Sequence, residues 1–241
     1  MQPLTTAVTR GIYTVRPAQG ARDTAAAMAL RQTCFRAGSS RPDTDRFDAA
    51  SQHMLVMAGD TLVASFRTQT FDDAGSLPTG YTAQFYDLTP LQTLPGPMIE
   101  LGRFCLHPDH ADPDILRLAW AALTGMVDQT KAQLLFGCSS FAGADAHSHV
   151  ARLGYLAQRH LGPDTLRPGK RADETIDIGT LPSPAQTPTL PPLLKTYLAM
   201  GGWVSDHAVL DRDLNTTHVF TALQIARVPP ARAAALRALS G

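Results

Sequence analysis

Residues 98–108 read Met-Ile-Glu-Leu-Gly-Arg-Phe-Cys-Leu-His-Pro, and they mark the centre of the predicted structure. Apolar side chains fill this run except at Glu100 and Arg103, and a proline bounds it on each side, which predicts a strand near the middle of a sheet. Gly102 between the two charges predicts a β-bulge or a close approach of the backbone. A buried acid and a buried base are costly unless they are paired or take part in chemistry, so two interpretations stay open. One is a structural ion pair with neighbouring elements, and the other is a general base with a cation that orients a substrate.

The composition describes a chain with a substantial apolar core and no excess charge. Of its 241 residues 44% are hydrophobic, enough for one large domain or two small ones. Lys plus Arg and Asp plus Glu number 21 each, so no overall field favours nucleic acid as a partner. No uncharged apolar stretch approaches the roughly 18–20 residues that span a bilayer, and residues 1–14 lack the pattern of a signal peptide. The three cysteines have no CxxC spacing, which favours reduced thiols in a cytoplasmic protein over a disulfide framework or a zinc site.

Hydrophobic periodicity and turn residues predict the other elements outward from a central strand at 98–107. Strands are expected at 12–16, 53–58, 61–70, 84–88, 133–139, 203–210 and 217–225, and helices at 22–36, 114–129, 145–156, 192–200 and 229–239. This order predicts an α/β (α+β) fold with one mixed, mostly antiparallel central sheet and helices on both faces. Prolines make 162–192 a long surface connection. We predict a single domain over residues 1–241, with a core at about 10–160 and a C-terminal extension at about 161–241 packed on it.

Several motifs carry a resemblance to known enzymes. They are Asp45-x-Phe47-Asp48, Glu100-Leu-Gly-Arg-Phe-Cys105, Gly137-Cys-Ser-Ser-Phe-x-Gly143, Pro191-Pro-Leu-Leu-Lys-x-Tyr-Leu198, Asp206-x-Ala-Val-x-Asp211 and Asn215-Thr-Thr-x-Val-Phe220. In this order they resemble the N-acyltransferases that start ornithine lipid synthesis, which have the Gcn5-related N-acetyltransferase (GNAT) fold. The Asp-x-Phe-Asp and Glu-x-x-Arg-Phe pattern also resembles the acyl-homoserine lactone synthases, but that likeness fades after the central strand.

The resemblance implies transfer of a 3-hydroxyacyl chain from acyl carrier protein to the α-amine of L-ornithine, which gives lyso-ornithine lipid. The alternatives are another acceptor such as glutamine or lysine, a lactone synthase that would need an S-adenosylmethionine site, and a non-catalytic module that only binds acyl carrier protein. The turn at 108–114 has two prolines, three acids and no glycine, so it is a poor cradle for the pyrophosphate of coenzyme A. This favours a donor delivered by a carrier protein, with no bound cofactor.

Aminolysis of a thioester needs a group that takes a proton from the attacking ammonium. Glu100 is the candidate base, directly or through water, because burial in a strand would raise its pKa toward neutrality. Arg103 is the second catalytic candidate, either binding the carboxylate of the amino acid or fixing the loop that contains Asp45 and Asp48. Those two aspartates would alternatively hold the side-chain ammonium of ornithine. The same acidic loop also fits a merely solvated loop, and it lacks the Gly and the terminal Glu of a calcium loop.

Four further residues are candidates for substrate binding. Arg31 and Phe35, one helical turn apart, resemble positions that line the acyl pocket of the lactone synthases, the alternative being a salt-bridged arginine and a core phenylalanine. Ser139 and Ser140 follow a predicted strand and would donate hydrogen bonds to the oxyanion or to the pantetheine amide. No GxSxG elbow surrounds them, so a nucleophilic serine is not expected. The histidines have no convincing ligand spacing, and we expect no metal.

The expected partners follow from the donor and the product. Carrier proteins are acidic, which calls for a basic docking patch. The densest basic cluster is Arg152, Arg159, His160, Arg167, Lys170 and Arg171, with a solvated basic loop as the alternative. An amphipathic product favours peripheral contact with the inner membrane surface. Segment 229–239, with two arginines among alanines and leucines, would either rest on anionic lipid or close the fold.

Overall fold

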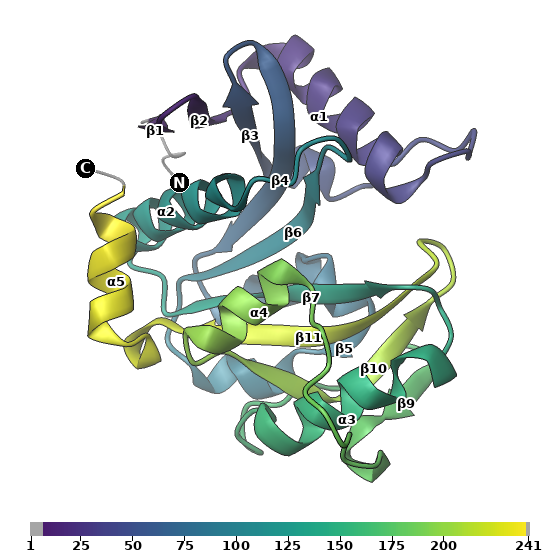
Figure 1. Ribbon diagram of the computed structural model, residues 1–241. Coiled ribbons are helices and arrows are strands. Elements are labelled where there is room, and N and C mark those ends of the chain that lie inside the picture. Colours follow the sequence, from purple (N-terminus) through teal and green to yellow (C-terminus); the bar gives the residue numbers. More distant parts are fainter. Residues whose placement is uncertain (1–6, 240–241) are drawn as a thin grey trace. The chain divides into compact units, whose positions relative to one another are not determined.

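The computed structural model describes residues 7–239, whose strands and helices gather into two units (Figure 1). Of the described residues, the first unit takes in 7–70, 101–132 and 229–239. The second unit consists of Phe71–Glu100 and Gln133–Val228. Each unit is therefore assembled from segments that are distant in the sequence.

Antiparallel strands form the sheet of the first unit. Strands β1 (Val8–Arg10), β2 (Tyr13–Pro17), β3 (Gln52–Ala58) and β4 (Thr61–Phe71) follow one another across it. The later part of β6 (Met98–Leu106) lies beside β4. Successive residues of β3 and of β4 are buried although successive side chains of a strand point to opposite faces. Both faces of these strands are therefore covered.

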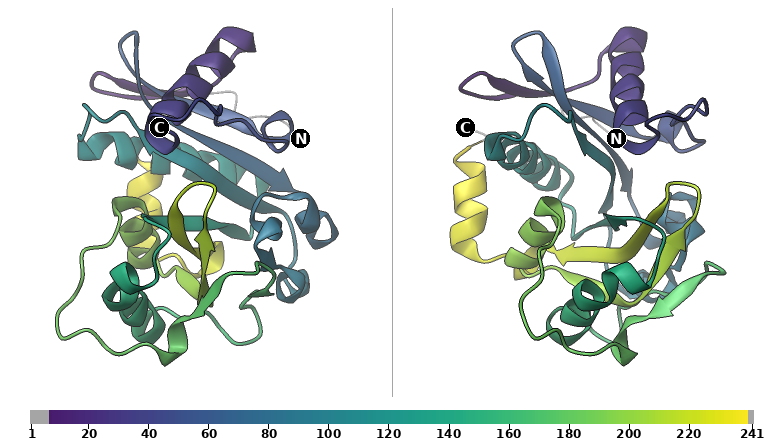
Figure 2. Two further views of the ribbon diagram at one scale, coloured as in Figure 1. Left: turned by 90° about the vertical axis from the view of Figure 1, so that its right-hand side faces the viewer. Right: turned by 45° about the vertical axis from the view of Figure 1, so that its right-hand side comes forward.

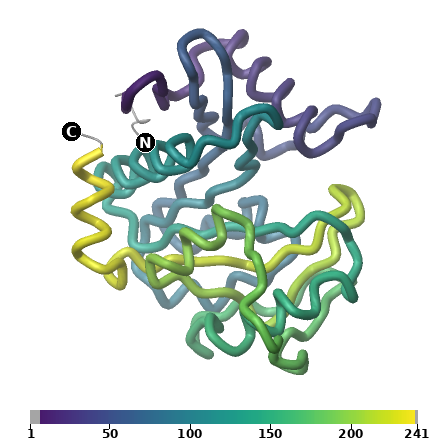
Figure 3. Tube along the Cα trace, viewed as in Figure 1, coloured from purple at the N-terminus to yellow at the C-terminus, as the bar shows by residue number. Residues whose placement is uncertain are grey.

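Three helices belong to the first unit. Helix α1 (Gly20–Phe35) packs on β3, and α2 (Pro113–Thr130) packs on β1 and β2 (Figure 2). Asp112 caps α2 through its side chain, which accepts a hydrogen bond from the Asp114 N–H at 2.9 Å. Helix α5 (Pro230–Arg237) packs across one end of α2, where the guanidinium of Arg237 contacts the carboxylate of Asp128 at 2.7 Å (Figure 3).

The second unit has its own antiparallel strands and its own core. Strands β7 (Leu134–Ala142), β11 (Thr216–Gln224), β10 (Trp203–Asp211) and β9 (Thr175–Asp177) are neighbours in that order. The short strands β5 (Tyr86–Asp87) and β8 (Gly169–Lys170) pair separately. Helix α3 (Val150–Arg159) packs on β10, and α4 (Pro192–Ala199) packs on β11. The ring of Phe220 lies within 6.0 Å of the rings of Phe136, Trp203 and Tyr86, at the centre of the apolar core.

Short 3-10 helices connect these elements. They are η1 (Asp48–Ala50), η2 (Ala74–Thr79), η3 (Thr82–Gln84), η4 (Thr89–Thr93), η5 (His147–His149), η6 (Ile178–Thr180) and η7 (Ile225–Arg227).

The predicted fold class is confirmed, and the differences concern individual elements. The helix expected at 145–156 begins only at Val150, after a 3-10 turn, and it continues past Gly154. This glycine does not end the helix. It leaves room for the carbonyl oxygen of Pro182, which would lie 2.2 Å from a Cβ at this position. The proline-rich connection 162–192 contains β8 and β9, which the sequence analysis did not predict.

The prediction of a single domain over 1–241 stays a prediction. Residues 161–228 pack with 71–100 and 133–160 in the second unit, whereas the segment from Pro229 belongs to the first. Among residues 7–239, no helix is long and apolar enough to cross a membrane. Residues 1–6, part of the segment in which no signal peptide was expected, lie outside the described residues.

Candidate active site

Four arginines and three aspartates form a buried network of ion pairs in the first unit, here called the ion cluster. The members are Asp43, Asp45 and Asp48 with Arg31, Arg36, Arg67 and Arg103. Arg31 comes from α1, Arg67 from β4 and Arg103 from β6, whereas Arg36 follows the end of α1. Asp43 and Asp45 lie in the loop after α1, and Asp48 begins η1. The fold thus brings Arg31, Asp45, Asp48 and Arg103, four predicted site residues, into one network.

Arg31 is the most buried arginine of the ion cluster, with 1% of its surface exposed. Its Nε donates to Asp43 Oδ2 at 2.8 Å, and its Nη1 donates to Asp48 Oδ1 at 2.6 Å. Arg36 adds a contact from Nε to the other oxygen of Asp43 at 3.3 Å. Such planar, forked donors fit carboxylates well, and pairing is what makes a buried guanidinium tolerable. Arg31 therefore fixes the loop on α1.

Asp45 is the most accessible carboxylate of the ion cluster, since its side chain is 20% exposed against 13% for Asp48 and 1% for Asp43. Arg67 donates to both carboxylate oxygens of Asp45, from Nη1 at 2.6 Å and from Nη2 at 2.9 Å. It also donates to Asp48. Arg103 contacts Asp45 Oδ2 at 3.3 Å and Asp43 Oδ2 at 3.2 Å. This is the contact that a loop-fixing Arg103 requires. Its binding of a substrate carboxylate stays a prediction.

Local hydrogen bonds give the acidic loop its shape. The Asp45 N–H donates to Asp48 Oδ2 at 2.8 Å, and the Phe47 N–H donates to Asp45 Oδ1 at 3.0 Å. Gln32 of α1 accepts the N–H of Asp43 at 2.8 Å and donates to the carbonyl of Ser39 at 2.9 Å. These are the side-chain to backbone bonds by which Asp and Asn-like residues favour turns.

The pKa values of Asp43, Asp48 and the neighbouring His53 are shifted by burial and by the charges of the ion cluster. Burial alone would raise the pKa of Asp43, but Arg103, Arg31 and Arg36 outweigh it and lower that pKa. The pKa of Asp48 is also lowered, because Arg31, the Asp45 N–H and Arg67 outweigh the effect of burial. Burial lowers the pKa of His53 despite the nearby Asp48 carboxylate. At neutral pH, Asp43 and Asp48 are therefore ionised and lie near a neutral His53.

Arg103 reaches the ion cluster through an unusual backbone. Its φ is +51°, in the left-handed region that few residues other than glycine adopt. The irregularity expected at Gly102 therefore lies one residue later. A Cβ at Gly102 would have only an ordinary contact, 3.7 Å from Arg67 Nε. The guanidinium of Arg103 lies 5.8 Å from the ring centre of Phe35, a half-buried residue of α1.

Glu100 belongs to the second unit, where its carboxylate is 4% exposed. The Tyr81 N–H donates to Oε2 at 3.0 Å, and the Thr82 N–H donates to Oε1 at 2.5 Å. Hydrogen bonds from backbone amides stabilise the ionised form of a carboxyl group. Burial and these two hydrogen bonds therefore both act on this carboxyl group. The base role of Glu100 stays a prediction.

Ser139 and Ser140 lie within β7, which extends to Ala142, and do not follow it as expected. Ser139 is buried and Ser140 is exposed, because adjacent residues of a strand face opposite sides. Ser140 is opposite His218 of β11. The ring of that histidine contacts the hydroxyl of Tyr86 through Nδ1 at 3.1 Å. Binding of an oxyanion or amide by either serine stays a prediction.

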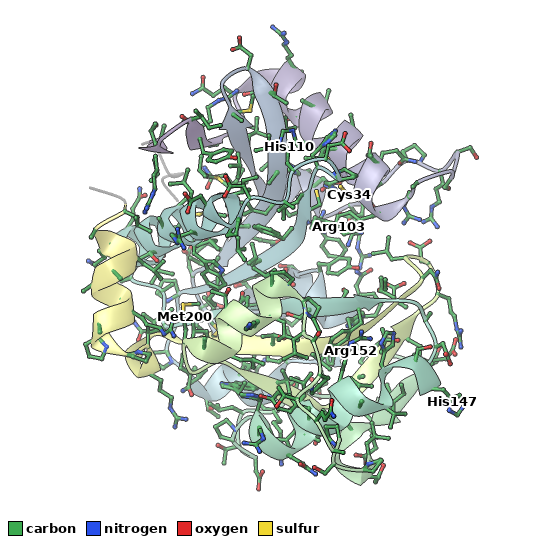
Figure 4. All side chains as sticks on the ribbon, viewed as in Figure 1. Cys34, Arg103, His110, His147, Arg152 and Met200 are labelled. Atoms are coloured by element: carbon green, nitrogen blue, oxygen red, sulfur yellow. The ribbon has the colours of Figure 1, made fainter. Side chains whose placement is uncertain are left out.

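Two of the thiols have local partners. Cys34 of α1 donates to the carbonyl of Leu106 at 3.1 Å. Figure 4 labels Cys34 on α1 and Arg103 on β6. Burial contributes to raising the pKa of the Cys105 thiol, as does the Cys34 side chain, the larger cause. Within residues 7–239, no group of three or more His, Cys, Asp or Glu side chains has the arrangement of a metal site.

The sequence analysis missed some members of the site. Asp43 was visible in the acidic run and Arg67 in the apolar strand 61–70, where an isolated charge signals a buried partner. Arg36 carried no such signal, because it follows a helix. The amides of Tyr81 and Thr82 have no signature at all, because backbone N–H groups are common to nearly every residue.

Comparisons with known proteins agree with this architecture. The family model described as "Acetyltransferase (GNAT) domain" matches residues 30–121, which include the ion cluster and Glu100. Among solved structures, the loading GNATL domain of CurA from Lyngbya majuscula is similar, with a TM-score of 0.50 and 12% identity. The likeness covers 90% of this chain and 99% of that domain, and it shows the fold alone.

Two curated relatives extend over most of the chain. The L-ornithine N(alpha)-acyltransferase of Rhodobacter capsulatus is 33% identical, covering 86% of this chain and 88% of that protein. The protein of the same name from Brucella abortus is 30% identical, covering 83% of this chain and 76% of its own length.

Proposed function

Because the chain belongs to the L-ornithine N(alpha)-acyltransferase family, we propose that it transfers a 3-hydroxyacyl chain from acyl carrier protein to the α-amine of L-ornithine, giving lyso-ornithine lipid. The observation that carries the proposal is the 33% identity over 86% of the chain. In the reaction, the ammonium loses a proton and the amine nitrogen attacks the thioester carbonyl. The tetrahedral oxyanion then collapses to an amide, and the carrier thiol leaves.

Glu100 is the proposed proton acceptor, directly or through water. Its carboxylate is buried and held by the amides of Tyr81 and Thr82, which supports a fixed orientation. A positioned base of this kind contributes roughly 10²–10⁴-fold to rate. Ser140, exposed on β7, is the better placed of the two serines to donate to the oxyanion or the pantetheine amide.

The ion cluster is the proposed acceptor site. Asp45 is its most exposed carboxylate, which supports contact with the side-chain ammonium of ornithine, and Asp48 shares that role in the proposal. Arg103 would bind the carboxylate of the amino acid or hold the loop that does. The pairing of Arg31 with Asp43 and Asp48 supports its salt-bridged alternative over direct contact with the acyl chain, whereas Phe35 is half-buried and remains a candidate for that contact.

A carrier-delivered donor is supported by the start of α2. Asp112 accepts the Asp114 N–H through its side chain and the Ile115 N–H through its carbonyl, so amides that cradle phosphate in other proteins already have partners. The proposed docking patch is the basic cluster at 152–171, with no cofactor in the reaction. Three of its arginines have hydrogen-bond or ion-pair partners. Arg152 donates to Thr189 O at 3.1 Å, Arg171 donates to Ala83 O at 2.8 Å, and Arg167 pairs with Asp164.

We place the protein in the cytoplasm, with peripheral contact at the inner membrane as the less supported part of the proposal. Helix α5 packs on α2 and its Arg237 pairs with Asp128, which favours closure of the fold over contact with lipid.

Mass spectrometry of the products tests the proposed function. Purified protein is incubated with 3-hydroxyacyl carrier protein and, separately, with ornithine, glutamine, lysine or S-adenosylmethionine. Acylated ornithine that is lost in Glu100→Ala is the expected result. Acylated glutamine or lysine would support the same reaction with a different acceptor amino acid. A lactone formed with S-adenosylmethionine would indicate an acyl-homoserine lactone synthase. Carrier binding without any product would indicate a binding module.

A further inference from the structure

The carboxylate of Glu100 lies directly against the backbone of residues 80–82. Oε2 accepts the Tyr81 N–H at 3.0 Å and Oε1 accepts the Thr82 N–H at 2.5 Å, so each oxygen has its own donor. Two successive amides that converge on one anion fix the plane of the carboxylate as well as its position.

Gly80 precedes these amides, and the space beside it is taken. A Cβ at position 80 would lie 2.9 Å from Glu100 Oε2 and 2.8 Å from Cζ of Phe71. It would also lie 3.3 Å from the carbonyl oxygen of Leu77. The φ of Gly80 is −81° and its ψ is 166°, which any residue adopts, so space and not conformation requires glycine here.

The neighbours of that missing Cβ differ in their freedom to move. The ring of Phe71 is 2% exposed and packs against Phe136 at 6.0 Å between ring centres. Leu77 is fully buried, and its carbonyl accepts the N–H of Gly80 at 3.0 Å. A methyl group at position 80 would therefore move the Glu100 carboxylate rather than the core.

We propose that Gly80 is a positioning residue for Glu100, which lets the carboxylate reach the amides of Tyr81 and Thr82 and so sets the geometry of the base. The proposal rests on the proposed function for its effect on rate, but its structural content does not. With a side chain at position 80, the carboxylate loses the Tyr81 N–H and turns away from the reacting amine.

Steady-state kinetics of Gly80→Ala, Glu100→Gln and the double variant test the proposal. Gly80→Ala is expected to lower kcat of amide formation about 100-fold, as a small misplacement of a reacting group does. KM for the amino acid and for the acyl carrier protein should change little, and the pH profile of kcat should move. The double variant should be no slower than Glu100→Gln alone, because Gly80 acts through Glu100.

Gly75→Ala is the matched control. Gly75 lies in η2, five residues before Gly80, and the nearest atom to its added Cβ is a side-chain oxygen, Asp73 Oδ1, at 3.1 Å, with no backbone atom or Glu100 atom nearby. This variant should keep wild-type kcat and pH profile. Wild-type kcat and pH profile in Gly80→Ala would overturn the proposal, as would a double variant whose loss equals the product of the two single losses.

Failure of the proposed function remains distinguishable from failure of this inference. If Glu100→Gln keeps full activity, the base role is wrong. The contact between Gly80 and Glu100 is then tested by urea unfolding of the wild type, Gly80→Ala, Glu100→Gln and the double variant. Coupling between Gly80→Ala and Glu100→Gln in the free energy of unfolding would support the positioning role. Additive free-energy changes would overturn it.

Discussion

At the scale of single residues, the stability of the first unit depends on how its buried charges are paired. Arg31 is almost fully buried and binds two carboxylates. Removal of one partner from a buried ion pair typically costs about 3–5 kcal/mol, because the other charge stays desolvated. We therefore expect Arg31→Ala to lower the free energy of unfolding by about that amount, measured by urea denaturation at pH 7.

Arg117→Ala is the control for this prediction. Arg117 pairs with Asp114 on α2, where both side chains are substantially exposed (50% and 36%). Surface pairs contribute about 0–1 kcal/mol. If Arg31→Ala and Arg117→Ala lowered the free energy of unfolding by the same amount, burial would not determine how much these ion pairs stabilise the protein.

The ion cluster also predicts how stability depends on pH. The pKa of Asp43 and the pKa of Asp48 are both lowered in the folded protein, so the unfolded chain binds more protons below its ordinary aspartate pKa of about 3.9. Their contribution to stability is fully present above that pH and is lost as the pH falls through the folded pKa values. Urea midpoints measured between pH 6 and pH 3 should decrease with a slope steepest below about pH 4.

Asp43→Asn separates this effect from general acid denaturation. The variant loses one titrating carboxylate and should be less stable at pH 7, with a shallower decrease toward pH 3. His53 contributes at higher pH: its lowered pKa means that stability starts to fall below about 6.5, as the unfolded histidine takes up a proton. An Asp43→Asn curve parallel to that of the wild type would contradict the assignment.

The candidate site could be predicted from the sequence where side-chain chemistry is unusual for its surroundings. Glu100 and Arg103 interrupt an apolar run, and Asp45 and Asp48 form an acidic one. Their partners were less accessible to prediction, because the meeting of Arg67 with Asp45 depends on how α1, β4 and the intervening loop pack. The hydrogen bonds from the Tyr81 and Thr82 amides to Glu100 could not be predicted, because they depend on backbone geometry and on space at Gly80.

At the scale of elements, α3 shows how tertiary contact outweighs helix propensity. Alanine is favoured over glycine by about 1 kcal/mol inside a helix. At Gly154, however, a Cβ would lie 2.2 Å from the Pro182 carbonyl oxygen, a backbone atom that cannot rotate away. Overpacking costs about 1–3 kcal/mol. Gly154→Ala should therefore lower the melting temperature measured by circular dichroism.

Ala151→Gly in the same helix provides the comparison. Ala151 is exposed, so the change should cost only the helix propensity, about 0.5–1 kcal/mol. A higher melting temperature for Gly154→Ala than for the wild type would show that the chain near Pro182 moves aside freely.

Elements with a strong periodic signal were predicted within a few residues, and irregular ones were not. The hairpin of β3 and β4 was visible because Gly59-Asp60 separates two β-rich runs, and Gly59 has the φ of +57° that such a turn requires. The 3-10 helices η2 and η3 carry no hydrophobic period, so the sequence predicts no helix in the segment whose amides bind Glu100.

At the scale of the whole molecule, the order of elements was sufficient to predict the fold class, but not the division into units. The predicted core at 10–160 ends before strand β11, to which β7 is paired along its whole length. A fragment 1–160 therefore lacks one of the two strands that are hydrogen-bonded to β7. We expect the β7 amides that bond to β11 to be protected from hydrogen exchange in the full chain and to exchange freely in the fragment.

Peptides that cover β3 serve as the internal control in that experiment. All strand partners of β3 lie within residues 1–160, so its protection reports whether the first unit still folds in the fragment. Protected β7 amides in the fragment would contradict the expectation and would support the predicted core at about 10–160.

The pairing of β7 with β11 also has a consequence for synthesis on the ribosome. Strand β7 ends at residue 142 and β11 begins at residue 216, so 73 residues must be translated in between. At about 5–20 residues per second, the newly made strand waits roughly 4–15 s for its partner. Leu135 and Phe136, both buried in the finished protein, stay uncovered by β11 during that time. This interval makes the nascent chain a substrate for chaperones, and a slower ribosome lengthens its exposure.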